Sequence, residues 1–165
     1  MNVLRQHLPE DVAAAHASWS RHLSPGGLLI EGTCDRRGER LCAHLIRESY
    51  HGLTREGLLF HFGLESSFAP IMLRDYLPQD LRRKVKAGTR LGSFFEDWTA
   101  AWERTREGAT TPWEAFARSA RALRDVRADV DGEDALLEEG IVVWRPEGGV
   151  APEPSRPGPS RAERP

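Results

Sequence analysis

The feature that most constrains this chain is a helix, a tight turn and an apolar strand in its first 30 residues. Pro9 suits the first position of a helix, because its missing N–H has no helical partner there. Ser24-Pro25-Gly26-Gly27 breaks the helix predicted over 9–23 and turns the chain. The apolar-leaning face of that helix carries four side chains at helical spacing, namely Val12, His16, Trp19 and Leu23.

The apolar run Leu28-Leu29-Ile30 follows the turn directly and continues into Glu31-Gly32-Thr33. A short continuous apolar run bounded by a turn is typical of a strand that is buried on both faces. A helix, a tight turn and such a strand make up half of a βαβ unit, and we expect Met1–Leu4 to be the tail of its other strand. We therefore expect an α/β fold.

Further elements are predicted along the rest of the chain. Strands over 41–47 and 58–63 are joined by a polar link, which favours an antiparallel pair. Helices are predicted over 78–88, over 91–102 and after the capping box Thr111-Pro112-Trp113-Glu114. That last helix should bury Trp113, Phe116, Ala120 and Leu123, and a final strand is expected at 141–144.

The chain changes character at Pro146, and six of its 11 prolines lie between Pro146 and Pro165. Such a segment buries too little apolar surface to offset the entropy lost on ordering. We predict one α/β domain over 1–145 and a disordered Pro-rich tail over 146–165.

Charge and composition narrow the function class. The formal net charge is −2, which argues against a dedicated nucleic-acid-binding protein. Cys34 and Cys42 do not make a disulfide framework, and no signal peptide or membrane span is evident, so we expect a cytoplasmic protein. The six histidines lack the spacing of a metal-binding motif, so no metal is expected.

Two phrases carry a specific resemblance: Asn2-Val3-Leu4-Arg5-Gln6-His7-Leu8-Pro9, and Leu23-Ser24-Pro25-Gly26-Gly27-Leu28-Leu29-Ile30. In this order and spacing they resemble the end of the fourth strand, the fourth helix and the fifth strand of class I S-adenosylmethionine-dependent methyltransferases. Glu31-Gly32-Thr33-Cys34-Asp35, Leu77-Pro78-Gln79-Asp80-Leu81 and the helix with Trp98 and Trp102 more loosely resemble a bacterial subgroup, although Gln79 replaces its lysine.

The resemblance implies the C-terminal half of a Rossmann-like sheet, with added antiparallel strands and C-terminal helices, and S-adenosylmethionine as cofactor. The implied cofactor-binding residues are Asn2, Val3 and Leu4, and the implied substrate-facing residues are Arg5, Gln6, Thr33 and Asp35. Both groups follow strand carboxyl ends, where open parallel sheets bind ligands. Alternatively, Asn2 satisfies the backbone at a strand end, and Arg5 and Gln6 are solvated. For the 31–35 segment, we favour the capping of a loop over a substrate-facing role. No catalytic residue is assigned.

The same resemblance exposes a gap. The family's Gly-rich loop and its acidic ribose-binding residue lie before the fourth strand, and this chain has no G-x-G. We therefore expect an N-terminally truncated form that does not bind the cofactor alone. Its exposed sheet edge would invite a partner chain or self-association. The alternatives are a non-catalytic interaction module or split-enzyme subunit, and an unrelated α+β domain. The methyl acceptor is not defined, because the fold does not fix the function.

Overall fold

The computed structural model describes residues 2–63, 67–131, 133–147 and 149. Its elements, in chain order, are η1 (Val3–Gln6), α1 (Asp11–Ser20), β1 (Leu28–Cys34), β2 (Arg40–Ser49), β3 (Gly52–Phe62), η2 (Pro70–Tyr76), α2 (Arg90–Thr105), α3 (Pro112–Arg124), β4 (Val130–Asp131), α4 (Asp134–Glu138) and β5 (Ile141–Trp144).

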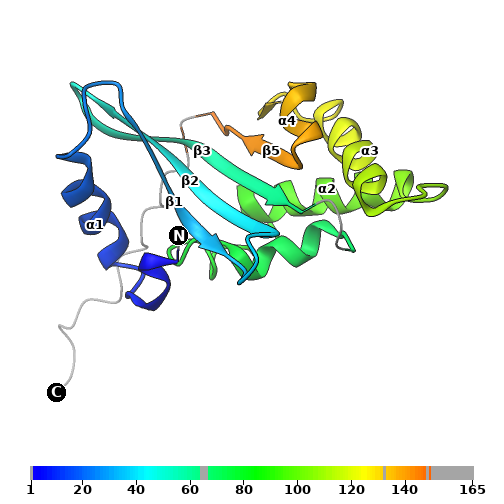
Figure 1. The fold of residues 1–165 in the computed structure, drawn as a ribbon, viewed down its shortest axis with the longest axis horizontal. Helices are drawn as coiled ribbons and strands as arrows, with labels where there is room; N and C mark the ends of the chain where they lie inside the picture. Colours follow the sequence, from blue (N-terminus) through cyan, green and yellow to red (C-terminus); the bar gives the residue numbers. More distant parts are fainter. Residues whose placement is uncertain (1, 64–66, 132, 148, 150–165) are drawn as a thin grey trace, which may run out of the picture.

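The five strands form one open sheet in the order β1-β2-β3-β5-β4, and each pair of neighbours is antiparallel. The fold is thus α/β in the broad sense, with α1 toward one end of the sheet and α3 and α4 toward the other (Figure 1). The predicted antiparallel pair is confirmed, since Leu41 lies opposite His61. The polar link that was expected between the two strands is shorter than predicted. β2 continues to Ser49 and β3 already begins at Gly52, so Gly57 lies within β3.

A bulge in β3 decides which way its first half faces. Leu45 lies opposite Gly57, but Ile46 lies opposite Arg55, so Glu56 is an extra residue on β3. Since side chains alternate between the two faces of a strand, the extra residue lets Arg55 share the face of Ile46. Glu56 points to the other face, where it pairs with Arg47 and Arg145.

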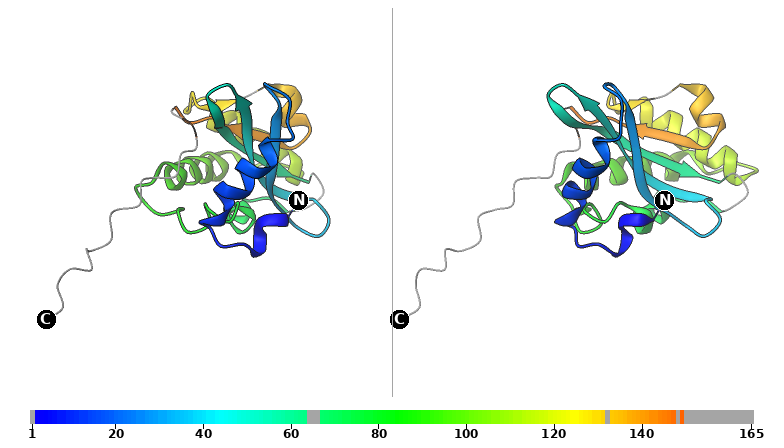
Figure 2. Two further views of the ribbon diagram at one scale, coloured as in Figure 1. Left: turned by 90° about the vertical axis from the view of Figure 1, so that its left-hand side faces the viewer. Right: turned by 60° about the vertical axis from the view of Figure 1, so that its left-hand side comes forward.

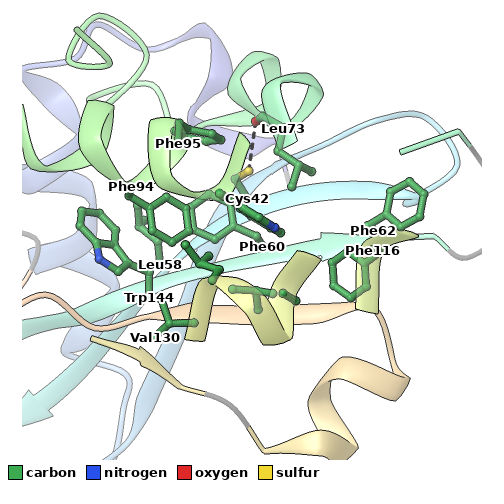
Figure 3. Close-up of a cluster of buried hydrophobic side chains, with 14 of the residues drawn as sticks. Cys42, Leu58, Phe60, Phe62, Leu73, Phe94, Phe95, Phe116, Val130 and Trp144 are labelled. Atoms are coloured by element: carbon green, nitrogen blue, oxygen red, sulfur yellow. Dashed lines mark hydrogen bonds between the residues drawn. The ribbon is translucent and has the colours of Figure 1, made fainter. Parts of the chain in front are cut away.

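One face of the sheet carries the hydrophobic core (Figure 3). The ring of Phe60 stacks on Phe94 of α2 with a centroid separation of 5.0 Å, and Phe94 stacks on Trp144 of β5, also at 5.0 Å. Buried Cys42 donates a hydrogen bond to the carbonyl oxygen of Leu73 in η2 at 3.2 Å. The core therefore joins the sheet to η2, α2 and α3, whose contributions include Leu73, Phe94, Phe95, Trp98, Phe116 and Leu123.

The prediction that Leu28-Leu29-Ile30 is buried on both faces is wrong. Leu28 is 40% exposed and Ile30 is 44% exposed. The reason is that β1 is an edge strand, and alternate residues of β1 point away from the face that carries the core.

The helix predictions succeed where a cap is present. α2 begins after Thr89, whose side chain accepts a hydrogen bond from the N–H of Gly92, and α3 begins after Thr111, which caps Glu114 in the same way. The capping box is only half formed, because the Glu114 carboxylate accepts from Thr110 instead of Thr111. α1 is confirmed but is shorter than predicted. Figure 2 shows α1 and η1 beside the strands.

The helix predicted over 78–88 is not formed, because this segment is a series of turns. The N–H of Leu81 bonds to the carbonyl of Pro78 at 2.9 Å, and the N–H of Lys84 bonds to that of Leu81 at 2.8 Å. Leu77, Asp80 and Leu81 all point inward, and Asp80 bonds to two strands. Tertiary contacts outweigh the local helix signal here.

β4 and α4 were not predicted, because both are very short. Within the described residues, no helix is long and apolar enough to cross a membrane. Most of the predicted tail, at 148 and 150–165, lies outside the described residues.

We expect Phe60→Ala to lower the free energy of unfolding by about 3–5 kcal/mol, because it opens a cavity beside the three aromatic rings that pack on Phe60, namely Phe94, Phe95 and Trp98. Urea denaturation followed by tryptophan fluorescence measures this change. Tyr50→Ala is the matched control, since Tyr50 is 94% exposed. Equal effects of the two substitutions would contradict the assignment of Phe60 to the core.

Candidate functional site

The carboxyl end of β1 is joined to the N-terminal segment by Asn2. The backbone N–H of Asn2 donates to the carbonyl of Gly32 at 2.9 Å. The N–H of Cys34 donates to Asn2 Oδ1 at 2.8 Å, and Asn2 Nδ2 donates to the Cys34 carbonyl at 3.1 Å. Asn2 has a φ of 73°, a left-handed conformation that asparagine tolerates better than most residues.

These contacts follow the pattern of a parallel ladder. In an antiparallel pair two residues exchange both bonds, whereas in a parallel pair one residue bonds to the two residues that flank its partner. Asn2 bonds to Gly32 and Cys34, on either side of Thr33. Its side-chain amide oxygen takes the place that its own carbonyl would have in a continuous strand.

The other predicted cofactor-binding and substrate-facing residues differ in exposure. Val3 is 62% exposed, whereas Leu4 is 3% exposed and packs inward. Arg5 and Gln6 are exposed on η1. The structure therefore brings Asn2 to the β1 terminus but turns Leu4 away from the surface.

Thr33 and Asp35 lie at the same end of β1. Thr33 is buried at 3% exposure, on the face that carries the core. Asp35 Oδ1 accepts from the N–H groups of Arg37 and Glu39 at 3.1 and 2.8 Å. The Asp35 carboxylate therefore caps the turn between β1 and β2.

A second cluster of polar side chains lies beneath α1, on the core face of the sheet. We call it the buried ionic cluster, and it consists of His16 (α1), Glu31 (β1), His44 (β2), Arg55 (β3) and Asp80 (the 77–89 loop). His16 Nε2 lies 3.1 Å from Glu31 Oε2, and His44 Nε2 lies 2.9 Å from Asp80 Oδ1. Arg55 reaches Asp80 Oδ2 at 2.6 Å and His16 Nδ1 at 3.4 Å.

Burial controls the electrostatics of this cluster. His44 is fully buried, and burial lowers its pKa below the ordinary 6.5, although Asp80 partly opposes the shift. Burial alone would raise the pKa of Asp80, but the hydrogen bonds from His44 and Arg55, together with the charge of Arg55, outweigh burial and hold the pKa far below its usual range. The cluster thus keeps a carboxylate ionised beside a neutral imidazole.

Sequence spacing did not reveal this cluster, because its members come from five separate segments. One signal was available: His16 shares the apolar face of α1 with Val12, and Glu31 directly follows an apolar strand. Polar residues at inward positions need buried partners. The predicted site residues and this cluster are different sets, although both involve β1.

Two surface grooves lie elsewhere. A groove of about 520 Å³ is lined by Arg90, Asp97, Val126, Arg127, Ala128, Asp129, Arg145, Pro146 and Glu147. Another of about 310 Å³ lies between η2, the 85–87 segment and α2. Neither contains a predicted site residue. Within the part of the chain that the structure describes, no group of three or more His, Cys, Asp or Glu side chains could hold a metal ion.

Comparisons with known proteins do not assign the chain to a family. No protein-family model, no curated protein and no solved structure matches it.

We expect Asn2→Gly to expose the amide of Cys34 to hydrogen exchange. Glycine tolerates the positive φ of this position but lacks the amide oxygen that accepts the Cys34 N–H. Exchange rates measured by NMR should rise at Cys34 and stay unchanged at Ile46. Val3→Ala, an exposed neighbour, is the control. Unchanged protection of Cys34 in the glycine variant would show that Asn2 does not hold this strand end.

We expect Asp80→Asn to lower the free energy of unfolding by about 3–5 kcal/mol, because Arg55 loses its buried anionic partner. Asp75→Asn, an exposed carboxylate in η2, is the matched control. Urea denaturation near neutral pH measures both. A loss below about 1 kcal/mol, which is typical of a surface ion pair, would contradict a buried ion pair between Asp80 and Arg55.

We expect the free energy of unfolding to fall as the pH drops below the ordinary His pKa of 6.5. The folded-state pKa of His44 is lower than this value, so the unfolded chain binds more protons in this range. Asp80 acts with the same sign, but only below its ordinary pKa of 3.8. His44→Gln should flatten the dependence between about pH 7.5 and 5.5. His51→Gln, at an exposed turn, should not.

Proposed function

We propose that this chain is the C-terminal part of a class I S-adenosylmethionine-dependent methyltransferase. The full enzyme would transfer a methyl group from the cofactor to a nucleophile of an acceptor substrate. The proposal rests on the resemblance of the Asn2–Ile30 segment to that family. Under this proposal, the chain holds the C-terminal half of the family's Rossmann-like sheet. The five strands that the structure describes pair antiparallel with one another.

The observation that carries the proposal is the contact between Asn2 and the carboxyl end of β1. Its parallel pattern is what the last residue of a strand running beside β1 would make. The chain then passes through η1 and α1 and returns as β1, which is the path of a βαβ crossover. The antiparallel strands β2 and β3 lie on the other side of β1.

Among the described residues, β1 is the outermost strand of the sheet, with β2 on one side of it. The N–H of Glu48 on β2 donates to the carbonyl of Gly27 at 2.9 Å, so the carbonyl of Gly27 and, two residues further on, the backbone groups of Leu29 face β2. By alternation, Leu28 and Ile30 direct theirs to the free edge. A strand that precedes Asn2 would meet these groups in the register that Asn2 sets.

The described residues alone fit the cofactor poorly. The side-chain amide of Asn2 is engaged by Cys34 through both its oxygen and its nitrogen, and Leu4 is buried. Val3 offers exposed apolar surface but no hydrogen-bonding side chain. We therefore expect the cofactor to be bound by a longer form, and not by this chain alone.

A second candidate is a non-catalytic interaction module or the subunit of a split enzyme. It is favoured by the exposed Leu28 and Ile30 on the edge strand, because apolar edge strands pair readily with other chains. The partner, or a second copy of this chain, would then add a strand to β1.

The deciding experiment is the intact mass of the native protein in its own cells, followed by titration with S-adenosylhomocysteine. We expect a mass above 18.5 kDa and upstream residues that encode a strand and a Gly-rich loop. The longer form should bind S-adenosylhomocysteine with micromolar affinity in isothermal titration calorimetry, whereas the 165-residue chain should not.

The outcomes separate the two candidates. A longer form that does not bind S-adenosylhomocysteine would contradict the methyltransferase proposal. A native mass of 18.5 kDa together with a stable dimer or heteromer would favour the interaction module. Binding of the cofactor product by the 165-residue chain itself would support the enzyme but refute the need for a longer form.

A further inference from the structure

The second half of the 77–89 loop and the first residue of α2 carry a local excess of positive charge. Between Leu81 and Phe95 the sequence has five cationic side chains and no Asp or Glu. We call residues 82–90 the cationic segment, and its charged members are Arg82, Arg83, Lys84, Lys86 and Arg90. All of them are exposed except Lys84, which is half-buried. The formal net charge of the whole chain, −2, hides this local excess.

The charges of the cationic segment are not neutralised by neighbouring carboxylates. Within the part of the chain that the structure describes, none of its five cations forms an ion pair. Arg90 Nη1 donates only to the carbonyl oxygen of Glu147, at 2.7 Å. In contrast, arginines elsewhere on the surface are paired with carboxylates, among them Arg37, Arg47, Arg118 and Arg145.

The backbone beneath these side chains is held in one arrangement. Thr89 Oγ1 lies within hydrogen-bond distance of the carbonyl oxygens of Lys84 and Lys86, at 2.9 and 2.8 Å. Leu81 and Leu91, on either side of the segment, are buried in the hydrophobic core. A surface whose backbone is already ordered loses less conformational entropy when a partner binds.

The composition of the cationic segment narrows the kind of anionic partner. Its one large apolar side chain, Val85, packs partly buried against the core, and it has no aromatic residue. Protein interfaces have an apolar or aromatic centre, single-stranded nucleic acids stack their bases on aromatic rings, and membrane-surface segments insert apolar side chains. The backbone of a nucleic-acid duplex needs only cations beside its phosphates.

The neighbouring groove of about 310 Å³ does not favour an acidic peptide. Lys86 lines this groove, but Glu96 and Glu103 of α2 line it as well. Like charges repel, so these carboxylates disfavour an acidic chain that lies along the groove. They confine a polyanion to the cationic segment itself, which gives it a short footprint.

We propose that the cationic segment binds the phosphate backbone of a nucleic-acid duplex without reading its sequence. Arg82, Arg83, Lys84 and Lys86 supply the phosphate contacts, whereas Arg90 is engaged with Glu147. The contact is weak and depends strongly on salt, because it is electrostatic and the chain as a whole is slightly acidic. It is independent of the proposed methyltransferase function, and its test requires no cofactor.

Fluorescence anisotropy of the full chain with a labelled DNA duplex of about 20 base pairs tests the proposal. With about four phosphate contacts, the logarithm of the binding constant should fall with the logarithm of the salt concentration at a slope of about −3.6. The affinity should therefore drop about 100-fold between about 50 mM and about 200 mM salt. A duplex of unrelated sequence should bind equally well, because phosphate contacts carry no sequence information.

A pair of matched variants locates the contact. Arg82→Ala/Arg83→Ala should weaken binding at about 50 mM salt by about tenfold or more and make the salt slope shallower by about 2. Arg36→Ala/Arg37→Ala is the control, because it removes the same charge from another exposed pair of arginines. Arg37 already pairs with Glu39 in that turn, so the control should keep the slope of the unmodified chain.

Four results would overturn the proposal. One is the absence of duplex binding at about 50 mM salt. Another is an equal loss in the two variants, which would mean that total charge matters and the cationic segment does not. Tighter binding of a labelled polyglutamate peptide than of the duplex would assign the segment to an acidic protein. Tighter binding to phosphatidylserine vesicles would assign it to a membrane surface.

Discussion

The carboxylate of Asp80 is the interaction on which the arrangement of this protein most depends. It bonds to His44 at 2.9 Å and to Arg55 at 2.6 Å, and so ties the 77–89 loop to two strands. Arg55 in turn faces His16, so α1 is linked to the same carboxylate. Buried ion pairs of this kind add little net stability over apolar packing, but they are costly to break. They fix where each segment lies.

The sequence predicted the elements whose signals are local and missed those set by tertiary contacts. Thr89 and Thr111 begin their helices as capping residues should, and β2 pairs with β3 as the polar link between them indicated. Residues 78–88 were predicted as a helix because the bonds of Asp80 to two strands are not visible in the local sequence. The buried ionic cluster was missed for the same reason. Of the predicted site, the sequence located the β1 terminus, but it could not show that Asn2 and Cys34 satisfy each other.

The two ends of β1 differ in how far their backbone groups are satisfied. Near the carboxyl end, Asn2 supplies both an N–H and an amide oxygen, so Gly32 and Cys34 are paired on the side away from β2. Near the amino end, Leu28 and Ile30 expose apolar side chains beside a free edge. A strand running beside β1 would continue what Asn2 begins, whether the same polypeptide or another chain supplies it.

The extra residue at Glu56 determines the polarity of both faces of β3. It allows two adjacent charged residues to serve opposite sides: Arg55 enters the buried ionic cluster, and Glu56 joins Arg47 and Arg145 on the other face. A strand with unbroken alternation, in the same register with Ile46 opposite Glu56, would bury the acid and expose the guanidinium. The buried anions would then outnumber any cation able to balance them. The length of the hairpin between β2 and β3 is therefore constrained. An insertion that shifted this part of β3 by one residue against β2 would turn Glu56 toward the interior in place of Arg55, so that the interior would receive a negative charge instead of a positive one.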